Sequence, residues 1–223
     1  MQAMILAAGR GERMRPLTDL CPKPLLLAGG KPLIVHQIER LKQAGFDEVI
    51  INTAYLANQI HERLGDGKDF GLRIHYSDEG SQALETAGGL RYALRLVDSP
   101  TLLVINGDIY TDFDLERLLP QAGNPRPYLV LVPNPTHHPQ GDFHLGRDNR
   151  LVNKMPPNPW TFSGIGCYPT ALLAQIPKGP APLAPYLRQW IDGPGIEAEV
   201  HTGLWMDIGT PQRLADLDRR LNE

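Results

Sequence analysis

Cysteine is scarce in this chain: Cys21 and Cys167 are the only two among 223 residues, and they lie far apart. Two thiols without a recurring spacing match neither the disulfide framework of a small secreted protein nor a zinc site. Long apolar runs are also missing, since no stretch approaches the roughly 20 residues that span a bilayer. The first residues, Met1 to Met4, carry no basic segment of the kind that begins a signal peptide. We therefore expect a cytoplasmic protein without a membrane partner.

An excess of charge of one sign is missing as well. The formal net charge is −3, and the 22 Lys and Arg residues are not gathered into runs. This balance argues against a polymeric nucleic acid as a partner, because binding to one requires a dense basic surface. A hydrophobic fraction of 42% over this length suffices for a buried core, so we expect a single domain over residues 1–223, as a monomer or small homo-oligomer.

Short apolar runs alternate with helical patterns through the first half of the chain. The helical patterns occupy residues 32–45, 56–64 and 86–96, the first beginning at Pro32 and ending at Gly45. Strands separated by helices of this length predict βαβ units, and hence an α/β fold with a doubly wound, mostly parallel sheet covered on both faces. The runs that predict buried strands lie at residues 3–8, 49–52, 72–76 and 101–105.

The second half changes character. A strand is predicted at residues 128–132, followed by a loop whose His137 and His138 we interpret as solvated. Thr210 and Pro211 predict the cap and first residue of a final helix. The remaining predictions are a hairpin from 143–145 and 151–154 within an insertion near 133–160, a strand at 162–168 that returns to the main sheet, and loops around one short helix at 177–195.

The segment at residues 6–14, LAAGRGERM, is the most informative part of the chain. A buried strand runs directly into small residues and two glycines, so a ligand can approach the backbone and successive N–H groups can cradle phosphate. Arg13 adds a planar fork for phosphate oxygens, and Lys23 adds a mobile positive charge. The segment is not a dinucleotide fingerprint, because Met14 stands where the third glycine belongs, and the Walker pattern is absent.

Two aspartates are candidates for binding a metal ion. Asp108 follows the predicted strand at 101–105, and the carboxyl ends of parallel strands are where such sheets bind ligands. Mg²⁺ commonly takes one or two carboxylates together with waters and phosphate oxygens. Asp207 lies between apolar neighbours on a short predicted strand, where an unpaired charge would be costly. A divalent ion is one compensation for that charge, and an arginine or a set of backbone N–H groups is another.

These segments resemble, in order, the motifs of the sugar-phosphate nucleotidyltransferases. The family signature reads Leu-Ala-Ala-Gly-x-Gly-x-Arg-Met-x-Pro-Leu-Thr and then Pro-Lys-Pro, and this chain has LAAGRGERMRPLT at 6–18 and PKPL at 22–25. A second glycine segment at 85–89 and a Trp-x-Asp-x-Gly-Thr-Pro segment at 205–211 follow. The resemblance implies a Rossmann-like fold of the GT-A type, with a nucleotide-binding half at about 1–132 and a sugar-binding part at about 133–223.

The resemblance also implies roles for individual residues. Lys23, Arg13 and Asp108 would be catalytic, and Asp108 and Asp207 would bind Mg²⁺. The nucleotide would be held by Leu6, Ala8, Gly9, Gly11, Glu12, Arg13, Lys23, Gly88 and Asn106. The sugar phosphate would contact Gly141, Asp142, Asn153, Ser163 and Gly164. Relatives carry a glutamate near the end of the hairpin, and in the segment from Val152 to Pro156 its nearest match is Asn153, which puts that sugar contact in question.

The implied reaction joins a sugar 1-phosphate to a nucleoside triphosphate and releases pyrophosphate. An ionised phosphate needs no general base, which agrees with the absence of an obvious Ser-His pair. Many relatives carry a long C-terminal extension, so the short chain favours UTP and N-acetylmuramate α-1-phosphate as substrates in cell-wall recycling. The alternatives are GTP with mannose 1-phosphate, dTTP with glucose 1-phosphate, a cytidylyltransferase acting on an alcohol phosphate, and a nucleotide-sugar-binding regulator without turnover.

Overall fold

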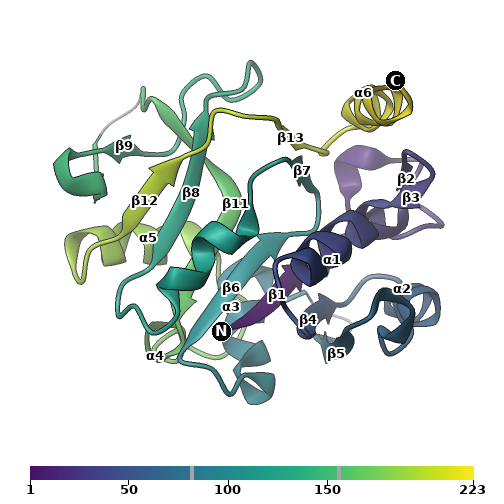
Figure 1. Ribbon diagram of the computed structural model, residues 1–223, viewed down its shortest axis with the longest axis horizontal. Helices are drawn as coiled ribbons and strands as arrows, with labels where there is room; N and C mark the ends of the chain where they lie inside the picture. Colours follow the sequence, from purple (N-terminus) through teal and green to yellow (C-terminus); the bar gives the residue numbers. More distant parts are fainter. Residues whose placement is uncertain (81–82, 155–156) are drawn as a thin grey trace.

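Seven strands form one sheet in the order β12–β8–β11–β6–β1–β4–β5 (Figure 1). The computed structural model describes residues 1–80, 83–154 and 157–223. Adjacent strands are parallel except on the two sides of β11 (Trp160–Pro169), which runs antiparallel to β6 and β8. The mostly parallel α/β sheet predicted from the sequence is therefore confirmed. The other strands of the sheet are β1 (Gln2–Leu6), β4 (Glu48–Thr53), β5 (Arg73–Asp78), β6 (Thr101–Asn106), β8 (Tyr128–Pro133) and β12 (Glu197–Val200).

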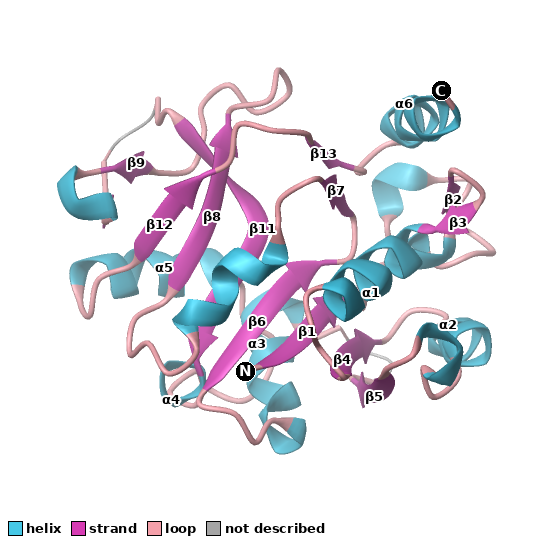
Figure 2. Ribbon diagram, viewed as in Figure 1, coloured by secondary structure: helices cyan, strands magenta, loops and turns pink. Residues whose placement is uncertain are grey.

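The sheet is covered on both faces because its strands are apolar on both faces. In β1, Ala3 and Ile5 join one core cluster and Met4 joins the other, as the alternation of side chains along a strand requires. Figure 2 shows the helices on either side of the sheet. The first cluster is covered by α1 (Leu33–Gln43) and α2 (Ala57–Leu64), and the second by α3 (Glu85–Ala93), α4 (Thr170–Leu173) and α5 (Leu183–Asp192).

A third apolar cluster attaches the last helix, α6 (Pro211–Asn222), to the glycine-rich segment. Met14 of that segment is fully buried in the cluster, together with Leu214 and Leu217 of α6. The Thr210 hydroxyl oxygen accepts a hydrogen bond from the Arg213 N–H at 3.3 Å, so the predicted cap is confirmed. This packing holds the start of α6 close to the loop that follows β1, although the two are about as far apart in the sequence as the chain allows.

The smaller elements complete the fold. The predicted hairpin is present as β9 (His144–Leu145) and β10 (Leu151–Val152), which pair antiparallel. Residues 155 and 156, at the end of the hairpin segment, lie outside the described residues. Two further two-stranded ribbons are β2 (Leu27–Ala28) with β3 (Lys31–Pro32), and β7 (Ile109–Thr111) with β13 (Trp205–Asp207). Single 3-10 turns lie at Glu12–Met14, Lys23–Leu25, Lys68–Phe70, Leu94–Leu96, Leu115–Gln121 and Arg147–Asn149.

Four short strands, β2, β3, β7 and β12, had no counterpart in the sequence prediction. β12 alternates charged and apolar residues over only four positions, Glu197 to Val200, so its apolar signal is weak. β7 is three residues long. None of the helices in the described part of the chain has the length and apolar character that crossing a bilayer requires.

The two thiols differ in accessibility, which gives a direct test of the packing. Cys167 lies on β11 with 1% of its surface exposed, and burial raises the pKa of its thiol to about 12. Cys21 is partly exposed, and burial raises the pKa of that thiol as well. Because the thiolate is the reactive form, we expect iodoacetamide to label Cys21 slowly in the native protein and Cys167 only after unfolding. Peptide mass spectrometry after a timed pulse measures both.

The Cys21→Ser variant is the matched control for this prediction. It should take up no label until it is denatured. Labelling of Cys167 in the native variant would contradict the position of β11 in the interior of the sheet.

Candidate active site

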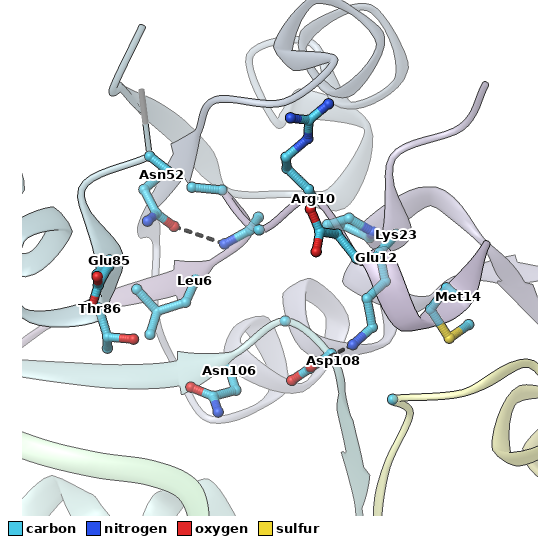
Figure 3. Close-up of a pocket in the computed structure, with 18 of the residues that line it drawn as sticks. Leu6, Arg10, Glu12, Met14, Lys23, Asn52, Glu85, Thr86, Asn106 and Asp108 are labelled. Carbon is cyan, nitrogen blue, oxygen red and sulfur yellow. Dashed lines mark hydrogen bonds and ion pairs between the residues drawn. The ribbon is translucent and has the colours of Figure 1, made fainter. Parts of the chain in front are cut away.

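A cleft of about 870 Å³ lies at the carboxyl ends of β1, β4, β5 and β6 (Figure 3). This edge of a parallel sheet is where α/β proteins bind ligands. Of the residues predicted to hold the nucleotide, all except Gly88 line it. The described residues that line it are Leu6 to Met14, Lys23, Pro24, Asn52, Glu79, Ala83, Glu85, Thr86, Asn106, Gly107, Asp108 and Gly209.

The glycine loop owes its shape to Gly11. This residue has a φ of +65°, and a Cβ atom there would lie 3.1 Å from both Lys23 Cβ and Thr18 Cγ2. The Gly11 carbonyl oxygen also accepts a hydrogen bond from Thr18 Oγ1 at 2.9 Å. A side chain at position 11 would therefore push the loop away from the segment that carries Lys23, and the absence of one lets that lysine reach the cleft.

Lys23 and Asp108 meet across the floor of the cleft. The Gly107 N–H donates to the Leu6 carbonyl oxygen at 2.9 Å, and a Cβ at Gly107 would lie only 2.6 Å from that oxygen. This close approach places Asp108 beside the glycine loop, where its Oδ2 is 2.5 Å from Lys23 Nζ (Figure 3). The lysine side chain is 11% exposed and the aspartate 37%. The cleft wall thus carries an ammonium group and a carboxylate whose remaining oxygen can accept another cation.

A chain of hydrogen bonds that the sequence analysis missed fixes the other end of the cleft. Asn52, the last residue but one of β4, is buried and accepts from the Ala7 N–H at 2.7 Å (Figure 3). Its amide donates to Glu79 Oε1 at 2.8 Å, and Glu79 Oε2 accepts from the Leu84 N–H at 2.7 Å. These bonds connect the ends of three strands to the start of α3. A polar residue at the carboxyl end of the predicted strand at 49–52 was the signal that could have identified Asn52.

Removing the Asn52 amide should destabilise the protein measurably. Asn52→Leu keeps the volume of the side chain but leaves the buried Ala7 N–H without its acceptor. We expect the free energy of unfolding to fall by about 2 kcal/mol, the usual cost of an unsatisfied buried donor. Urea unfolding followed by circular dichroism measures the change. Asn222→Leu, at the exposed end of α6, is the control, and an equal loss in both variants would contradict the role of Asn52.

Gly88 is not among the described residues that line the cleft, and its contact with the nucleotide stays a prediction. Its N–H donates to the Ala181 carbonyl oxygen at 3.1 Å, and a Cβ there would lie 2.3 Å from the Gly179 carbonyl oxygen. The glycine therefore allows α3 to pack tightly against the loop before α5. Glu85 and Thr86, at the start of α3, line the cleft in its place.

The second predicted metal ligand, Asp207, lies at the end of β13 in the β7–β13 ribbon. Asp108 is the residue that directly precedes β7 in this ribbon. Asp207 is in register with Ile109, and the Ile208 N–H donates to the Asp108 carbonyl oxygen at 2.7 Å. The Asp207 carboxylate itself is paired with Arg213, whose Nη1 is 2.6 Å from each of its oxygens. The sequence analysis left open whether a metal ion, an arginine or backbone N–H groups compensate the charge of Asp207. The structure shows the arginine, and the metal role of Asp207 stays a prediction.

Both histidines of the loop after β8 are exposed, at 41% and 40% of their side chains, as the solvated interpretation expects, and each also contacts a carboxylate. His137 Nε2 lies 2.9 Å from Asp207 Oδ1, and His138 Nε2 lies 3.0 Å from Asp142 Oδ1. Asp207 is distant from His137 in the sequence, whereas Asp142 is four residues after His138. The sequence analysis identified neither carboxylate as a partner of a histidine. His137 thereby connects the loop to the β7–β13 ribbon beside the cleft.

The carboxylates suit Mg²⁺ bound together with phosphate rather than a site made by protein alone. Within residues 1–80, 83–154 and 157–223, no three His, Cys, Asp or Glu side chains are gathered so that they could enclose a metal ion. Mg²⁺ usually takes one or two carboxylates and completes its shell with waters and substrate oxygens. Asp108 on the cleft wall and Asp207 on the neighbouring strand provide such a partial set of hard oxygen ligands.

On the predicted sugar side, two polar side chains are already engaged with the protein. Ser163 is 1% exposed, and its hydroxyl donates to the Val130 carbonyl oxygen at 2.7 Å. The Asp142 carboxylate accepts from the Phe162 N–H at 2.9 Å in addition to its contact with His138. Both side chains fix the backbone around the irregular middle of β11, where the pairing with β8 shifts register. Both side chains therefore have structural partners, and their sugar contacts stay a prediction.

Of the other three predicted sugar residues, Asn153 and Gly141 contact other parts of the protein, and Gly164 contacts a residue of the cleft wall. The side chain of Asn153 is paired with Arg188 of α5 at both ends of its amide, at 2.9 and 3.2 Å. A Cβ at Gly141 would lie 2.4 Å from the Asn158 carbonyl oxygen, so this glycine is needed for a tight turn. Gly164, with a φ of +85°, lies against the side chain of Asn106, a residue of the cleft wall, and is the member of the set that borders the cleft.

Comparison with known sequences finds relatives whose names agree with a cleft that binds a nucleotide. The family model described as nucleotidyl transferase matches residues 2–141. The chain is 48% identical to N-acetylmuramate α-1-phosphate uridylyltransferase from Neisseria meningitidis, over 97% of this chain and 96% of that protein. It is 31% identical to the protein of the same name from Caulobacter vibrioides, over 99% and 97%. It is also 31% identical to mannose-1-phosphate guanylyltransferase from Mycobacterium tuberculosis, over 95% of this chain and 62% of that longer protein.

Solved structures share the fold at lower identity. A proposed glucose-1-phosphate thymidylyltransferase from Bacillus anthracis, crystallised with sucrose, has a TM-score of 0.88 and 22% identity over 100% of this chain and 96% of its own. HddC from Yersinia pseudotuberculosis, crystallised with GMP-PN, has a TM-score of 0.80 and 20% identity over 98% of each chain. Similarity at this level of identity concerns the arrangement of the sheet and helices.

Proposed function

The chain belongs to the nucleotidyl transferase family and is an enzyme of that class, and from this premise we propose that it transfers the uridylyl group of UTP to N-acetylmuramate α-1-phosphate. The products would be UDP-N-acetylmuramate and pyrophosphate. The observation that carries the proposal is the gathering of the glycine loop, Lys23 and Asp108 in one cleft, in a chain that is 48% identical to an enzyme of that name over nearly its whole length.

The residues of the cleft have separate tasks in this reaction. An oxygen of the sugar phosphate forms a bond to the α-phosphorus of UTP, and the bond from that phosphorus to pyrophosphate breaks. The attacking phosphate is already ionised near neutral pH, so the chain supplies no base, and its task is to bring two anions together. The N–H groups of residues 9–11 and the Arg13 guanidinium would bind the triphosphate, while Lys23 would offset the charge that develops on the reacting phosphate.

Asp108 and Asp207 are the residues that would hold Mg²⁺. When bound, this ion neutralises phosphate charge and orients the phosphate oxygens. A preorganised cation in such a site contributes roughly 3–4 kcal/mol to the stability of the transition state. The chain itself would keep Asp108, in the turn between β6 and β7, close to Asp207 of β13, with Asp108 on the cleft wall.

A second pair of substrates has specific support. The identity of 31% with mannose-1-phosphate guanylyltransferase extends over 95% of this chain, so GTP and mannose 1-phosphate form the alternative. The two pairs share the phosphate chemistry and differ in the base and the sugar. The glycine loop, Lys23 and Asp108 do not discriminate between them.

The test is the release of pyrophosphate over a matrix of substrates. UTP, GTP, dTTP and CTP are each combined with the 1-phosphates of N-acetylmuramate, mannose and glucose, and CTP also with phosphocholine. We expect the highest kcat/KM for UTP with N-acetylmuramate α-1-phosphate, and loss of activity when Mg²⁺ is chelated. Turnover of GTP with mannose 1-phosphate alone would overturn the substrates but not the enzyme class. Full activity in the presence of a chelator would overturn the metal requirement.

A further inference from the structure

Each carboxylate of the proposed metal site is paired with a basic side chain of the protein. Asp108 is paired with Lys23, and Asp207 is paired with Arg213 of α6. The second carboxylate is the more enclosed, since Asp207 is 24% exposed and Asp108 is 37% exposed. Because Arg213 Nη1 is 2.6 Å from both Asp207 oxygens, the carboxylate has no oxygen that is clear of the guanidinium.

Arg213 also lies within reach of the cleft. A Cβ at Gly209 would be 2.5 Å from Arg213 Nη2 and 3.2 Å from Arg13 Nη2, so both guanidinium groups lie against Gly209, a residue of the cleft wall. The guanidinium Nε is 3.4 Å from Thr210 Oγ1 at the start of α6, and Nη1 is 2.6 Å from His137 Nε2 as well as close to Asp207. A rotation about the outer bonds of this side chain would move its end from Asp207 toward the cleft without moving the helix.

We propose that Arg213 is an exchangeable counter-ion, which neutralises Asp207 before substrates bind and then transfers to the phosphate groups beside Arg13. The inference rests on the proposed function, in which Asp207 binds a metal ion. An unpaired carboxylate in this enclosed position would be costly, so a resident cation stabilises the free enzyme. A guanidinium has a planar fork that matches a phosphate as well as a carboxylate, so the triphosphate offers Arg213 an equivalent partner.

A coupling between the ligands follows from this exchange. Metal binding alone requires Arg213 to leave Asp207 without gaining an anion, whereas metal and triphosphate together give each charged group a partner. Metal should therefore bind the free enzyme weakly and bind more tightly once the nucleotide is present, and by linkage the nucleotide should respond to metal by the same factor.

The test measures Mn²⁺ binding by electron paramagnetic resonance, with and without UTP, in Arg213→Met. Without nucleotide, this variant should bind Mn²⁺ about five- to tenfold more tightly than the wild type, because the guanidinium no longer competes for Asp207. With Mn²⁺ present, its affinity for UTP should fall about tenfold, because one phosphate contact is lost. A side chain with only a structural role would not give two changes of opposite sign.

Arg219→Met is the matched control, since it removes one positive charge from an exposed position on the same helix. It should change neither affinity. Arg213→Lys keeps the charge without the fork and should show both changes at smaller size, so the inference stays testable if the Met variant does not fold.

The Asp207→Asn variant distinguishes a failure of the proposed metal site from a failure of the counter-ion inference. If it leaves Mn²⁺ binding unchanged, the metal role of Asp207 fails, and that part of the proposed function fails with it. If Asp207→Asn weakens Mn²⁺ binding but Arg213→Met fails to strengthen it, the counter-ion inference is wrong and the proposed function stands.

Discussion

Asp108→Asn is expected to lower kcat about a thousandfold while the protein stays folded, because the change removes a charged ligand and leaves a group of the same shape. The carboxylate is 37% exposed at the cleft wall, so its replacement by an amide creates no void in the core. Initial rates of pyrophosphate release with the preferred substrate pair measure the loss, and circular dichroism measures the fold.

The control for this variant is Asp47→Asn. Asp47 forms an ion pair of 2.7 Å with Lys42 on the exposed surface, so the same chemical change is made where no ligand is expected. It should have wild-type rates. A rate near that of the wild type for Asp108→Asn, with Mg²⁺ as the sole divalent metal, would contradict the proposed mechanism.

Lys23→Met is expected to lower kcat/KM by about a hundredfold or more, since it removes one preorganised cation from the reacting phosphates. Methionine keeps much of the length of the lysine side chain, which is 11% exposed, so the packing against Gly11 is preserved. Steady-state kinetics at saturating Mg²⁺ give the value. Lys42→Met is the matched surface control and should be indistinguishable from the wild type.

The two variants also make a joint prediction. Lys23 and Asp108 are in direct contact, and residues that act as a unit have non-additive effects on rate. The double variant should therefore be about as active as the slower single variant. Effects that multiply fully in the double variant would show that the two side chains act at separate points of the reaction.

Local pattern was enough to predict the part of the site that is built from strand ends. The glycine loop follows β1 directly, and Asp108 follows β6, so the rule that parallel strands bind ligands at their carboxyl edge brings these residues together. Lys23 was predicted from its motif, and the reason that it reaches the cleft is the missing side chain at Gly11. The same rule also selects Asn52, because this polar residue lies at the carboxyl end of the predicted strand at 49–52.

The contacts that sequence did not predict join segments that are distant along the chain. His137, in the loop after β8, meets both Asp207 and Arg213, and no spacing rule connects it to either of them. Ser163 was expected at the sugar because its motif resembles one that lines such pockets, yet a register shift in β11 turns its hydroxyl to Val130. Gly88 was assigned to the ligand although its small size serves the packing of α3 against Gly179. In each case the decisive partner is set by tertiary packing.

The central place of β1 has a consequence for how the protein is made. This strand is synthesised before its two neighbours in the sheet, β4 and β6, and β6 ends only at Asn106. Until β6 has been synthesised, β1 has at least one edge free in the nascent polypeptide, a situation in which apolar strands aggregate. We expect the yield of native protein to respond strongly to growth temperature and to chaperones that bind nascent chains, more than its final stability would suggest.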